Sequence, residues 1–366
     1  AAIRPFIMTE AEAAKAPKSI KRVKGNGALK EYFFTVQIDP ADCTGCGNCA
    51  DVCPAKTKAL VMEPAATQEV EQANFEYMHT TIGYKDTLLP KAQNVKNSQF
   101  SQPLFEFSGA CAGCGETPYI KAITQLFGDR MMISNATGCS SIYGASFPAS
   151  PYCKDRNGRG PAWANSLFED NAEFGLGMRL GSERLRTSAE KLMNDAIGCD
   201  KCSAELKEFF KQWIANKSDV TITRELADKI VPLLSESKCE ACQKLIKFTD
   251  VLVPRSQWIF GGDGWGYDIG YGGLDHVLAS GENVNVLIVD TEVYSNTGGQ
   301  SSKSTPAGAV AKFATSGKKI RKKDLGMMAM SYGYVYVAQV AMGSSQAQFL
   351  NAVKEAEAYD GPSLII

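Results

Sequence analysis

The chain carries one segment in which cysteines dominate, Cys43-Thr44-Gly45-Cys46-Gly47-Asn48-Cys49-Ala50-Asp51-Val52-Cys53-Pro54. The spacing C-x2-C-x2-C-x3-C-P is typical of a chain that wraps a 4Fe–4S cluster with its first three thiolates and sends the fourth to a neighbouring cluster. A zinc site or a chance grouping is the alternative. Four cysteines closed by a proline favour iron and sulfide, so Cys53 is expected to serve a second cluster.

That second cluster needs a motif of its own, and residues 1–42 contain no cysteine. We therefore expect the matching motif upstream of Ala1. Residues 1–64 are predicted to form part of an α+β domain like that of the bacterial ferredoxins, with a strand at 32–38 and an apolar segment at 59–62. Residues 65–103 are polar, with scattered proline and asparagine, and are predicted to be a connector.

The composition narrows the class of protein. The chain has 366 residues and a net charge of −1, which gives no sign of nucleic-acid or membrane binding. No apolar run is long enough to span a membrane. Twelve cysteines favour a reducing compartment, and we expect a cytoplasmic protein. His79 and His276 are the only histidines, which disfavours a histidine-based catalytic triad. We therefore expect the chemistry to depend on cofactors.

From residue 104 onward, short apolar runs alternate with helical periods, which predicts an α/β domain with a parallel sheet. Within it, residues 182–250 show helical spacing among many charged residues and are predicted to be a helical insertion. Strands are predicted at 130–134, 257–260, 284–290, 333–340 and 363–366, and helices at 117–127, 268–280, 305–316 and 344–359.

A candidate diphosphate site follows two of these strands. Gly262-Asp263-Gly264 comes after the first, and Thr291 through Gln300 follows the second. Asp263, the Thr291 hydroxyl and the Val293 carbonyl are oxygen ligands that suit Mg²⁺, while the glycines allow close approach of a diphosphate. The segment fits neither the dinucleotide fingerprint nor a Walker A motif.

Two further cysteine sets are present. Cys111-Ala112-Gly113-Cys114 and the later Cys139 are one ligand short of a cubane. The fourth ligand is either Cys153 or a residue beyond Ile366, and a reduced structural pair is the alternative to a cluster. A third set lies on the helical insertion and is expected to bind zinc, with reduced or disulfide-linked pairs as the alternative; it comprises Cys199, Cys202, Cys239 and Cys242.

The Gly-Asp-Gly segment resembles the thiamine-diphosphate motif, with Thr291 where most thiamine enzymes have asparagine. Together with residues 43–54, 111–119 and 268–276, it makes the chain similar to the C-terminal third of the pyruvate:ferredoxin oxidoreductase family. The resemblance implies half of a two-cluster ferredoxin domain followed by a thiamine-diphosphate domain.

For the site, the resemblance implies that Cys43, Cys46 and Cys49 hold one cluster and that Cys53 joins the next. Cys111, Cys114 and Cys139 match ligands of a proximal cluster beside the thiamine, whose fourth ligand lies beyond Ile366. A full protomer would then carry three clusters. Asp263, Thr291 and Val293 match the Mg²⁺ ligands, and Glu116 and Asn296 match catalytic residues that line the thiamine. The remaining cofactor contacts are expected from Cys139, Gly262, Gly264, Trp265, Glu292, Tyr294 and Ser295.

The resemblance further implies oxidative decarboxylation of pyruvate with coenzyme A to acetyl-CoA and CO2, or the reverse reaction of a pyruvate synthase. Electrons would pass one at a time to ferredoxin or flavodoxin, in a homodimer whose N-terminal domains are missing here. Alternatives are another 2-oxo acid, a pure iron–sulfur electron-transfer module, or a non-redox thiamine decarboxylase. The strand-end oxygens disfavour the module, and the cysteines disfavour the decarboxylase. A basic stretch near the C-terminus is a candidate docking site for an acidic electron carrier, and a solvated loop is the alternative. It comprises Lys318, Lys319, Arg321, Lys322 and Lys323.

Overall fold

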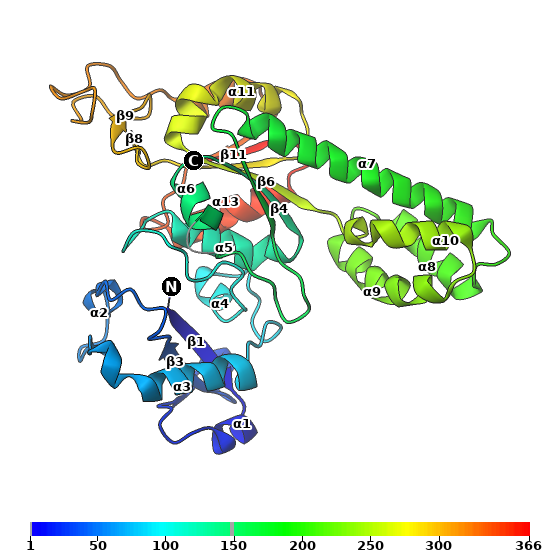
Figure 1. The fold of residues 1–366 in the computed structure, drawn as a ribbon, viewed down its shortest axis with the longest axis horizontal. Helices are drawn as coiled ribbons and strands as arrows, with labels where there is room; N and C mark the ends of the chain where they lie inside the picture. The colour runs from blue at the N-terminus through cyan, green and yellow to red at the C-terminus, as the bar shows by residue number, and fades with distance from the viewer. Residues whose placement is uncertain (1, 147–149) are drawn as a thin grey trace.

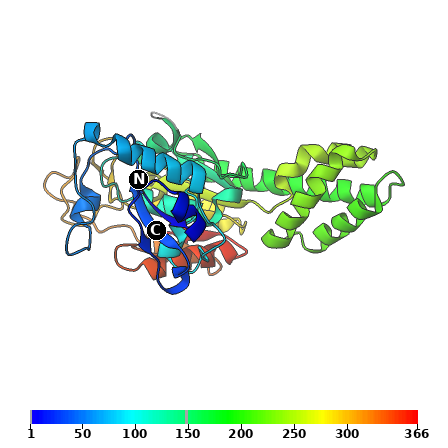
Figure 2. The same cartoon turned by 90° about the horizontal axis from the view of Figure 1, so that it is seen from below.

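A computed structural model describes residues 2–146 and 150–366. It shows a small N-terminal domain, a central α/β domain and a helical arm that projects from the central domain (Figures 1 and 2). Among the described residues, no helix is both long and apolar enough to cross a membrane.

The N-terminal domain is built on a three-stranded antiparallel sheet in the order β1-β3-β2. Its strands are β1 (Ile3–Met8), β2 (Val23–Lys24) and β3 (Phe33–Ile38). Helix α1 (Glu10–Lys15) begins at a capping box, in which Thr9 and Glu12 satisfy each other's backbone amides. The loop that carries the first cysteine set forms only the short helix α2 (Asn48–Asp51), and residues 59–62, all described, form no strand.

The segment expected to be a connector contains structure of its own. It includes α3 (Glu69–Tyr77) and α4 (Val95–Ser98). Side chains from Phe75 to Tyr84 pack with Phe6 and Met8 of the first strand in one buried cluster. The structure therefore draws this part of the segment into the core of the N-terminal domain.

The central domain holds a six-stranded parallel sheet in the order β10-β11-β7-β6-β4-β5. The predicted parallel sheet is thus confirmed. The strands are β4 (Met131–Ala136), β5 (Ala162–Ser166), β6 (Ser256–Gly262), β7 (Asn285–Val289), β10 (Tyr336–Ala338) and β11 (Ser363–Ile365).

Helices cover both faces of this sheet (Figure 1), so its central strands are apolar on both sides. On β6, Trp258 and Phe260 pack with α5 (Thr117–Phe127) and α13 (Gln346–Ala358). The intervening Ile259 packs on the other face with α11 (Tyr271–Ala279) and α12 (Leu325–Met330).

The arm consists of the far half of the long helix α7 and three shorter helices, and it confirms the predicted helical insertion (Figure 2). It has a hydrophobic core separate from that of the sheet, around Phe210, Trp213 and Ile230. The helices are α7 (Asn171–Ile197), α8 (Ala204–Ala215), α9 (Val220–Glu236) and α10 (Glu240–Leu245).

One predicted helix is wrong. Residues 305–316 form turns and isolated bridges instead. Gly308 and Phe313 adopt positive φ angles of 82° and 67°, which a right-handed helix does not allow. Val310 and Phe313 also point outward, so the segment has no buried face that would stabilise a helix.

Candidate active site

Three neighbouring strands of the sheet end at the same edge, and each is followed directly by predicted site residues. Asp263 follows β6, Thr291 comes two residues after β7, and Cys139 begins α6 (Cys139–Ser141) shortly after β4. Ligands of open α/β sheets bind at this carboxyl edge of the strands. The fold therefore brings together groups that are far apart in the sequence.

The three oxygens predicted to bind Mg²⁺ converge here. The Thr291 hydroxyl lies 3.2 Å from Asp263 Oδ1 and 3.2 Å from the Val293 carbonyl oxygen. Neighbouring ligands of an octahedral Mg²⁺ stand about 3 Å apart, because each lies about 2.1 Å from the ion. Both separations thus match the distance between neighbouring ligands of Mg²⁺.

Asp263 is only 1% exposed, and burial is the main reason that its pKa rises to about 6. Hydrogen bonds from Ser302, at 2.6 Å, and from Thr291 oppose this shift. Ser302 was not foreseen from the sequence, since nothing in the local pattern marks a loop serine as a partner of a distant aspartate. A bound cation would compensate the buried negative charge further.

The glycines of the Gly-Asp-Gly segment differ in their surroundings. A Cβ on Gly264 would lie 2.4 Å from the ring of Tyr294, so the loop approaches this ring as only glycine allows. A Cβ on Gly262 would meet only the Val289 carbonyl oxygen, at 4.0 Å, so this glycine faces open space at the edge of the sheet. Trp265 is fully buried beneath the site. The segment therefore combines close packing on one side with room for a ligand on the other.

Glu292 and Asp290 hold the loop after β7 in place. Glu292 has a left-handed backbone with φ of 65°, and its amide donates to Asp290 Oδ1 at 3.0 Å. Asp290 also accepts from Tyr267 and from Lys322, at 2.9 and 2.6 Å. This network fixes the turn that presents Thr291 and Val293.

The basic stretch after the site turns partly inward. Lys318 donates to the carbonyl oxygens of Ser302 and Thr305, and Lys322 pairs with Asp290. Lys323 lies over the ring of Tyr271. Only Lys319 and Arg321 of this stretch are exposed, so most of its charge stabilises the loop.

Two adjoining cavities lie at the carboxyl edge, with volumes of about 630 and about 110 Å³. The smaller one is lined by the Gly-Asp-Gly segment and by residues 293–297, and the larger one reaches the second cysteine set. They share the lining residues Glu116, Cys139, Val289, Thr291, Ser295 and Asn296.

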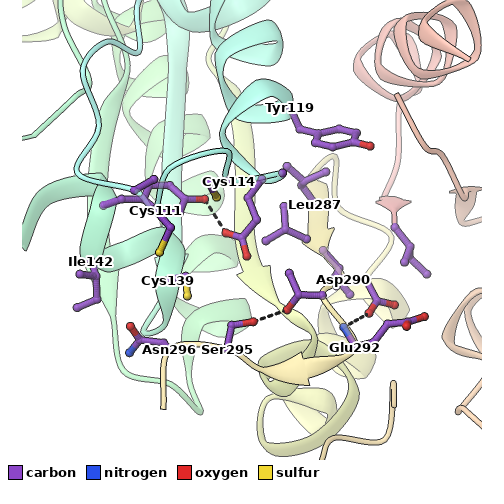
Figure 3. Close-up of a pocket in the computed structure, with 18 of the residues that line it drawn as sticks. Cys111, Cys114, Tyr119, Cys139, Ile142, Leu287, Asp290, Glu292, Ser295 and Asn296 are labelled. Atoms are coloured by element: carbon purple, nitrogen blue, oxygen red, sulfur yellow. Dashed lines mark hydrogen bonds between the residues drawn. The ribbon is translucent and has the colours of Figure 1, made fainter. Parts of the chain in front are cut away.

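Figure 3 shows Cys111 and Cys114 on the side of the larger cavity away from Ser295 and Asn296, with Cys139 closer to these two residues. Burial chiefly raises the pKa of the Cys139 thiol, to about 11, with the Glu116 carboxylate adding to the shift. Ile366 lines the same cavity, whereas Cys153 does not and instead donates to the Pro103 carbonyl at 3.3 Å.

Glu116 stands between the cysteines and the strand-end oxygens. It is 8% exposed and accepts a hydrogen bond of 2.8 Å from Tyr143, a residue that the sequence did not single out. Burial raises the pKa of Glu116, partly opposed by the Tyr143 hydrogen bond. The raised pKa favours the protonated form of this carboxyl group over a wider pH range than in water.

The cysteines of the N-terminal domain lie on a loop that is mostly exposed; Cys43 and Cys46 are exposed, and Cys49 and Cys53 are half-buried. Backbone amides after Cys53 donate to its sulfur, among them that of Ala59 at 3.4 Å, and lower the pKa of the Cys53 thiol. Amide donors of this kind favour the thiolate that a cluster requires.

The two cluster loops meet. Gly113, between Cys111 and Cys114, has φ of 70°, and a Cβ there would lie 2.4 Å from the side-chain nitrogen of Asn48, between Cys46 and Cys49. This contact was not foreseen, because Asn48 and Gly113 are 65 residues apart in the sequence. It places the two cysteine sets on facing loops.

All twelve cysteines lie in the described part of the chain, and none forms a disulfide. Within that part, no three histidine, cysteine, aspartate or glutamate side chains are gathered closely enough to form a metal site. This applies to the predicted cluster ligands as much as to the third set on the arm. In that set, Cys202, Cys239 and Cys242 are buried and Cys199 is half-buried.

Two family models match the chain. "Thiamine pyrophosphate enzyme, C-terminal TPP binding domain" covers residues 247–366, and "4Fe-4S dicluster domain" covers residues 9–57. These matches confirm the two predicted cofactor-binding domains.

Similar proteins cover the whole chain. "Pyruvate-flavodoxin oxidoreductase" of Klebsiella pneumoniae is 56% identical over 373 residues, which are 100% of this chain and 31% of that protein. "Pyruvate:ferredoxin oxidoreductase" of Moorella thermoacetica is 56% identical over 379 residues, 100% of this chain and 32% of that protein. "Pyruvate dehydrogenase (NADP+)" of Cryptosporidium parvum is 46% identical over 410 residues, 100% of this chain and 21% of that protein. The chain thus spans about a third of the length of the first two relatives.

Proposed function

The chain belongs along its full length to the pyruvate:ferredoxin and pyruvate-flavodoxin oxidoreductase family, and we propose that it supplies the thiamine-binding and electron-collecting part of such an enzyme. The complete protein would convert pyruvate and coenzyme A into acetyl-CoA, CO2, one proton and two electrons, or run the reverse reaction. Its unpaired cysteines suit the reducing cytoplasm.

One observation carries this proposal. The oxygens of Asp263, Thr291 and Val293 converge beside two adjoining cavities, and the larger of these is also lined by Cys111, Cys114 and Cys139. A non-redox thiamine enzyme needs only the first group, and an electron-transfer module needs only the second. An oxidoreductase that oxidises a 2-oxo acid on thiamine diphosphate and passes the electrons to iron–sulfur clusters uses both within one site.

Thiamine diphosphate, when bound, supplies an electron sink for the decarboxylation of a 2-oxo acid. The residues of this chain then have defined tasks. Asp263, Thr291 and Val293 hold the Mg²⁺ that neutralises the diphosphate. Gly262 leaves space for close backbone approach, and Asn296 lines both cavities where the cofactor would lie.

Glu116 is a proton-holding group beside the cofactor. Its buried position raises its pKa, and the Tyr143 hydroxyl fixes its orientation. A group of this kind can exchange a proton with the bound cofactor while the surrounding apolar residues exclude water.

A 4Fe–4S cluster accepts electrons one at a time. Cys111, Cys114 and Cys139 would hold the first acceptor, and Cys43, Cys46, Cys49 and Cys53 would serve the clusters of the N-terminal domain. The contact of Gly113 with Asn48 brings the two loops together, which gives electrons a short route away from the reaction site. Ferredoxin or flavodoxin is the proposed final acceptor, and a homodimer the proposed assembly.

The test uses the complete oxidoreductase that contains this chain, purified without oxygen. Thiamine diphosphate with Mg²⁺ is titrated by calorimetry into wild type and into Asp263→Asn. We expect the substitution to weaken binding by about 100-fold or more, the upper range for the loss of groups around a metal. Asp360→Asn, an exposed residue bonded to Asn283, is the matched control and should bind normally.

A second measurement follows reduction of ferredoxin, flavodoxin and NADP+ with pyruvate or 2-oxoglutarate, each with coenzyme A. Pyruvate-dependent reduction of ferredoxin or flavodoxin supports the proposal. Wild type that binds no thiamine diphosphate, or that responds to 2-oxoglutarate but not to pyruvate, would refute the proposed activity. Normal binding by Asp263→Asn would refute only the assignment of the metal ligand.

A further inference from the structure

The helical arm carries four cysteines to which neither the family matches nor the proposed reaction gives a role. Cys199 and Cys202 lie in the turn between α7 and α8, where the Cys202 amide donates to the Cys199 carbonyl at 3.2 Å. Cys239 and Cys242 lie at the start of α10, with Cys239 as its N-cap residue. The two pairs are separated by 36 residues (203–238), which form α8 and α9.

Folding brings these pairs into one cluster. Cys202, Cys239 and Cys242 belong to the buried core of the arm, and Cys199 packs against that core. Helix α10 also packs on α7, so the turn after α7 and the start of α10 lie side by side. One cysteine from each pair, Cys202 and Cys242, is thus brought into sulfur–sulfur contact.

The separation of one sulfur pair excludes a disulfide and is compatible with a metal site. The sulfur atoms of Cys202 and Cys242 are 3.8 Å apart. A disulfide requires about 2.05 Å. A tetrahedral zinc site with Zn–S bonds of about 2.3 Å places neighbouring sulfurs about 3.8 Å apart, because the tetrahedral edge is about 1.63 times the bond. The observed separation equals one edge of such a site.

From this geometry we propose that Cys199, Cys202, Cys239 and Cys242 form a structural zinc site at the end of the arm. Two sulfurs already stand at the required separation. Cys239 is buried in the same core, and Cys199 packs against it. Four protein ligands leave no open position, so the site has no catalytic role.

The position of the site indicates what the zinc does. The arm already has an apolar core built around Phe210, Trp213 and Leu234. The metal therefore does not replace a core. It fixes the turn after α7 to the start of α10, which are the two connections at one end of the helical bundle, and so limits opening of that end.

The first experiment measures zinc and iron by mass spectrometry in the complete, anaerobically purified enzyme, together with zinc K-edge absorption. We expect about one zinc per chain, bound by four sulfurs at about 2.3 Å. The absorption measurement needs no substitution, so it stays decisive even where a variant folds poorly.

Cys242→Ser and Cys199→Ser form the second experiment, with Cys153→Ser as the matched control. Cys153 is a half-buried cysteine outside the set whose thiol bonds to Pro103. Zinc should fall to a small fraction of the wild-type content in the first two variants and stay unchanged in the control. Iron content should be unchanged in all three, because Cys199 and Cys242 are not proposed cluster ligands and Cys153 does not line the cavity of the second cysteine set.

Three outcomes would overturn the proposal. Wild type without zinc, but with two or four fewer titratable thiols after denaturation, would show disulfides. Iron bound to the four sulfurs would show an additional iron site. Zinc that is retained in Cys242→Ser would show that the ion binds elsewhere. Each outcome leaves the proposed oxidoreductase activity untouched, because the arm lies apart from the candidate active site.

Discussion

Asp263 shows how single residues of the site depend on partners far away in the sequence. Its burial alone disfavours a charge, and the hydroxyl groups of Ser302 and Thr291 compensate part of that cost. The sequence identified Asp263 and Thr291 because both follow strands. It did not identify Ser302 or Tyr143, because a hydroxyl group becomes a partner only when the fold brings it to a carboxylate.

Lys121 on α5 gives the chain a stability that depends on pH. Burial lowers its pKa to about 7, and its ammonium group donates to side-chain oxygens of Gln99 and Gln125. In the unfolded chain the pKa of lysine is about 10.4, so between about pH 7 and pH 10 the unfolded state binds more protons. Stability should therefore rise with pH in this window, by at most about 1.4 kcal/mol per pH unit from this group.

Lys121→Met should remove this rise. Urea unfolding at about pH 7 and about pH 9 measures the slope of the free energy of unfolding with pH. The slope, unlike the absolute stability, does not depend on the two hydrogen bonds that methionine also removes. Lys96→Met, an exposed lysine of α4, is the control and should keep the wild-type slope. An unchanged slope in Lys121→Met would show that Lys121 stays charged in the folded chain.

Among the secondary-structure elements, the sequence predicted correctly those whose apolar pattern matches the burial seen in the structure. The strands β6 and β7 are buried on both faces and were predicted within about two residues. Strand β5 was missed, because this edge strand reads Ala-Trp-Ala-Asn-Ser and is only partly buried. For residues 305–316 the error is the opposite one, because a helix was predicted and none is present. Their alanines favour a helix, but the surrounding loop gives them no surface to pack on.

The loop between Cys111 and Cys114 is the element on which contact between the two cluster regions depends. Gly113→Ala introduces a side chain at a positive φ and close to Asn48, which should cost about 1 kcal/mol or more. We expect the variant to bind the cluster proposed for Cys111, Cys114 and Cys139 less well, and to transfer electrons to the proposed clusters of the N-terminal domain more slowly. Iron analysis and rapid-freeze EPR after mixing with pyruvate measure both effects.

Gly115→Ala is the matched control, because its added Cβ meets no atom within 4 Å and its backbone has no positive φ. It should retain wild-type iron content and kinetics. Equal behaviour of the two variants would show that the approach of Gly113 to Asn48 has no part in holding the loops together.

At the scale of the whole molecule, the N-terminal domain must be held at a fixed position for electrons to leave the site. The sequence predicted the cofactors of both domains, yet it could not predict how the domains meet. Besides the approach of Gly113 to Asn48, the domains meet through Arg4 of β1, which is 1% exposed, and Glu106 at the entry to the α/β domain. The Arg4 guanidinium donates to Glu106 at 2.7 and 3.1 Å and lies over the ring of Phe107.

Arg4→Met should loosen this interface, because it leaves the Glu106 carboxylate buried without its partner, at a cost of about 3–5 kcal/mol. The double variant Arg4→Met with Glu106→Gln removes the uncompensated charge and should recover much of the loss. Hydrogen exchange in β1 and in residues 104–108 reports the opening of the interface. Lys85→Met, which breaks a more exposed ion pair with Glu12, should cost less than about 1 kcal/mol. If single and double variants exchange equally fast, the charge of Glu106 does not hold the domains together, and packing around Phe107 must do so.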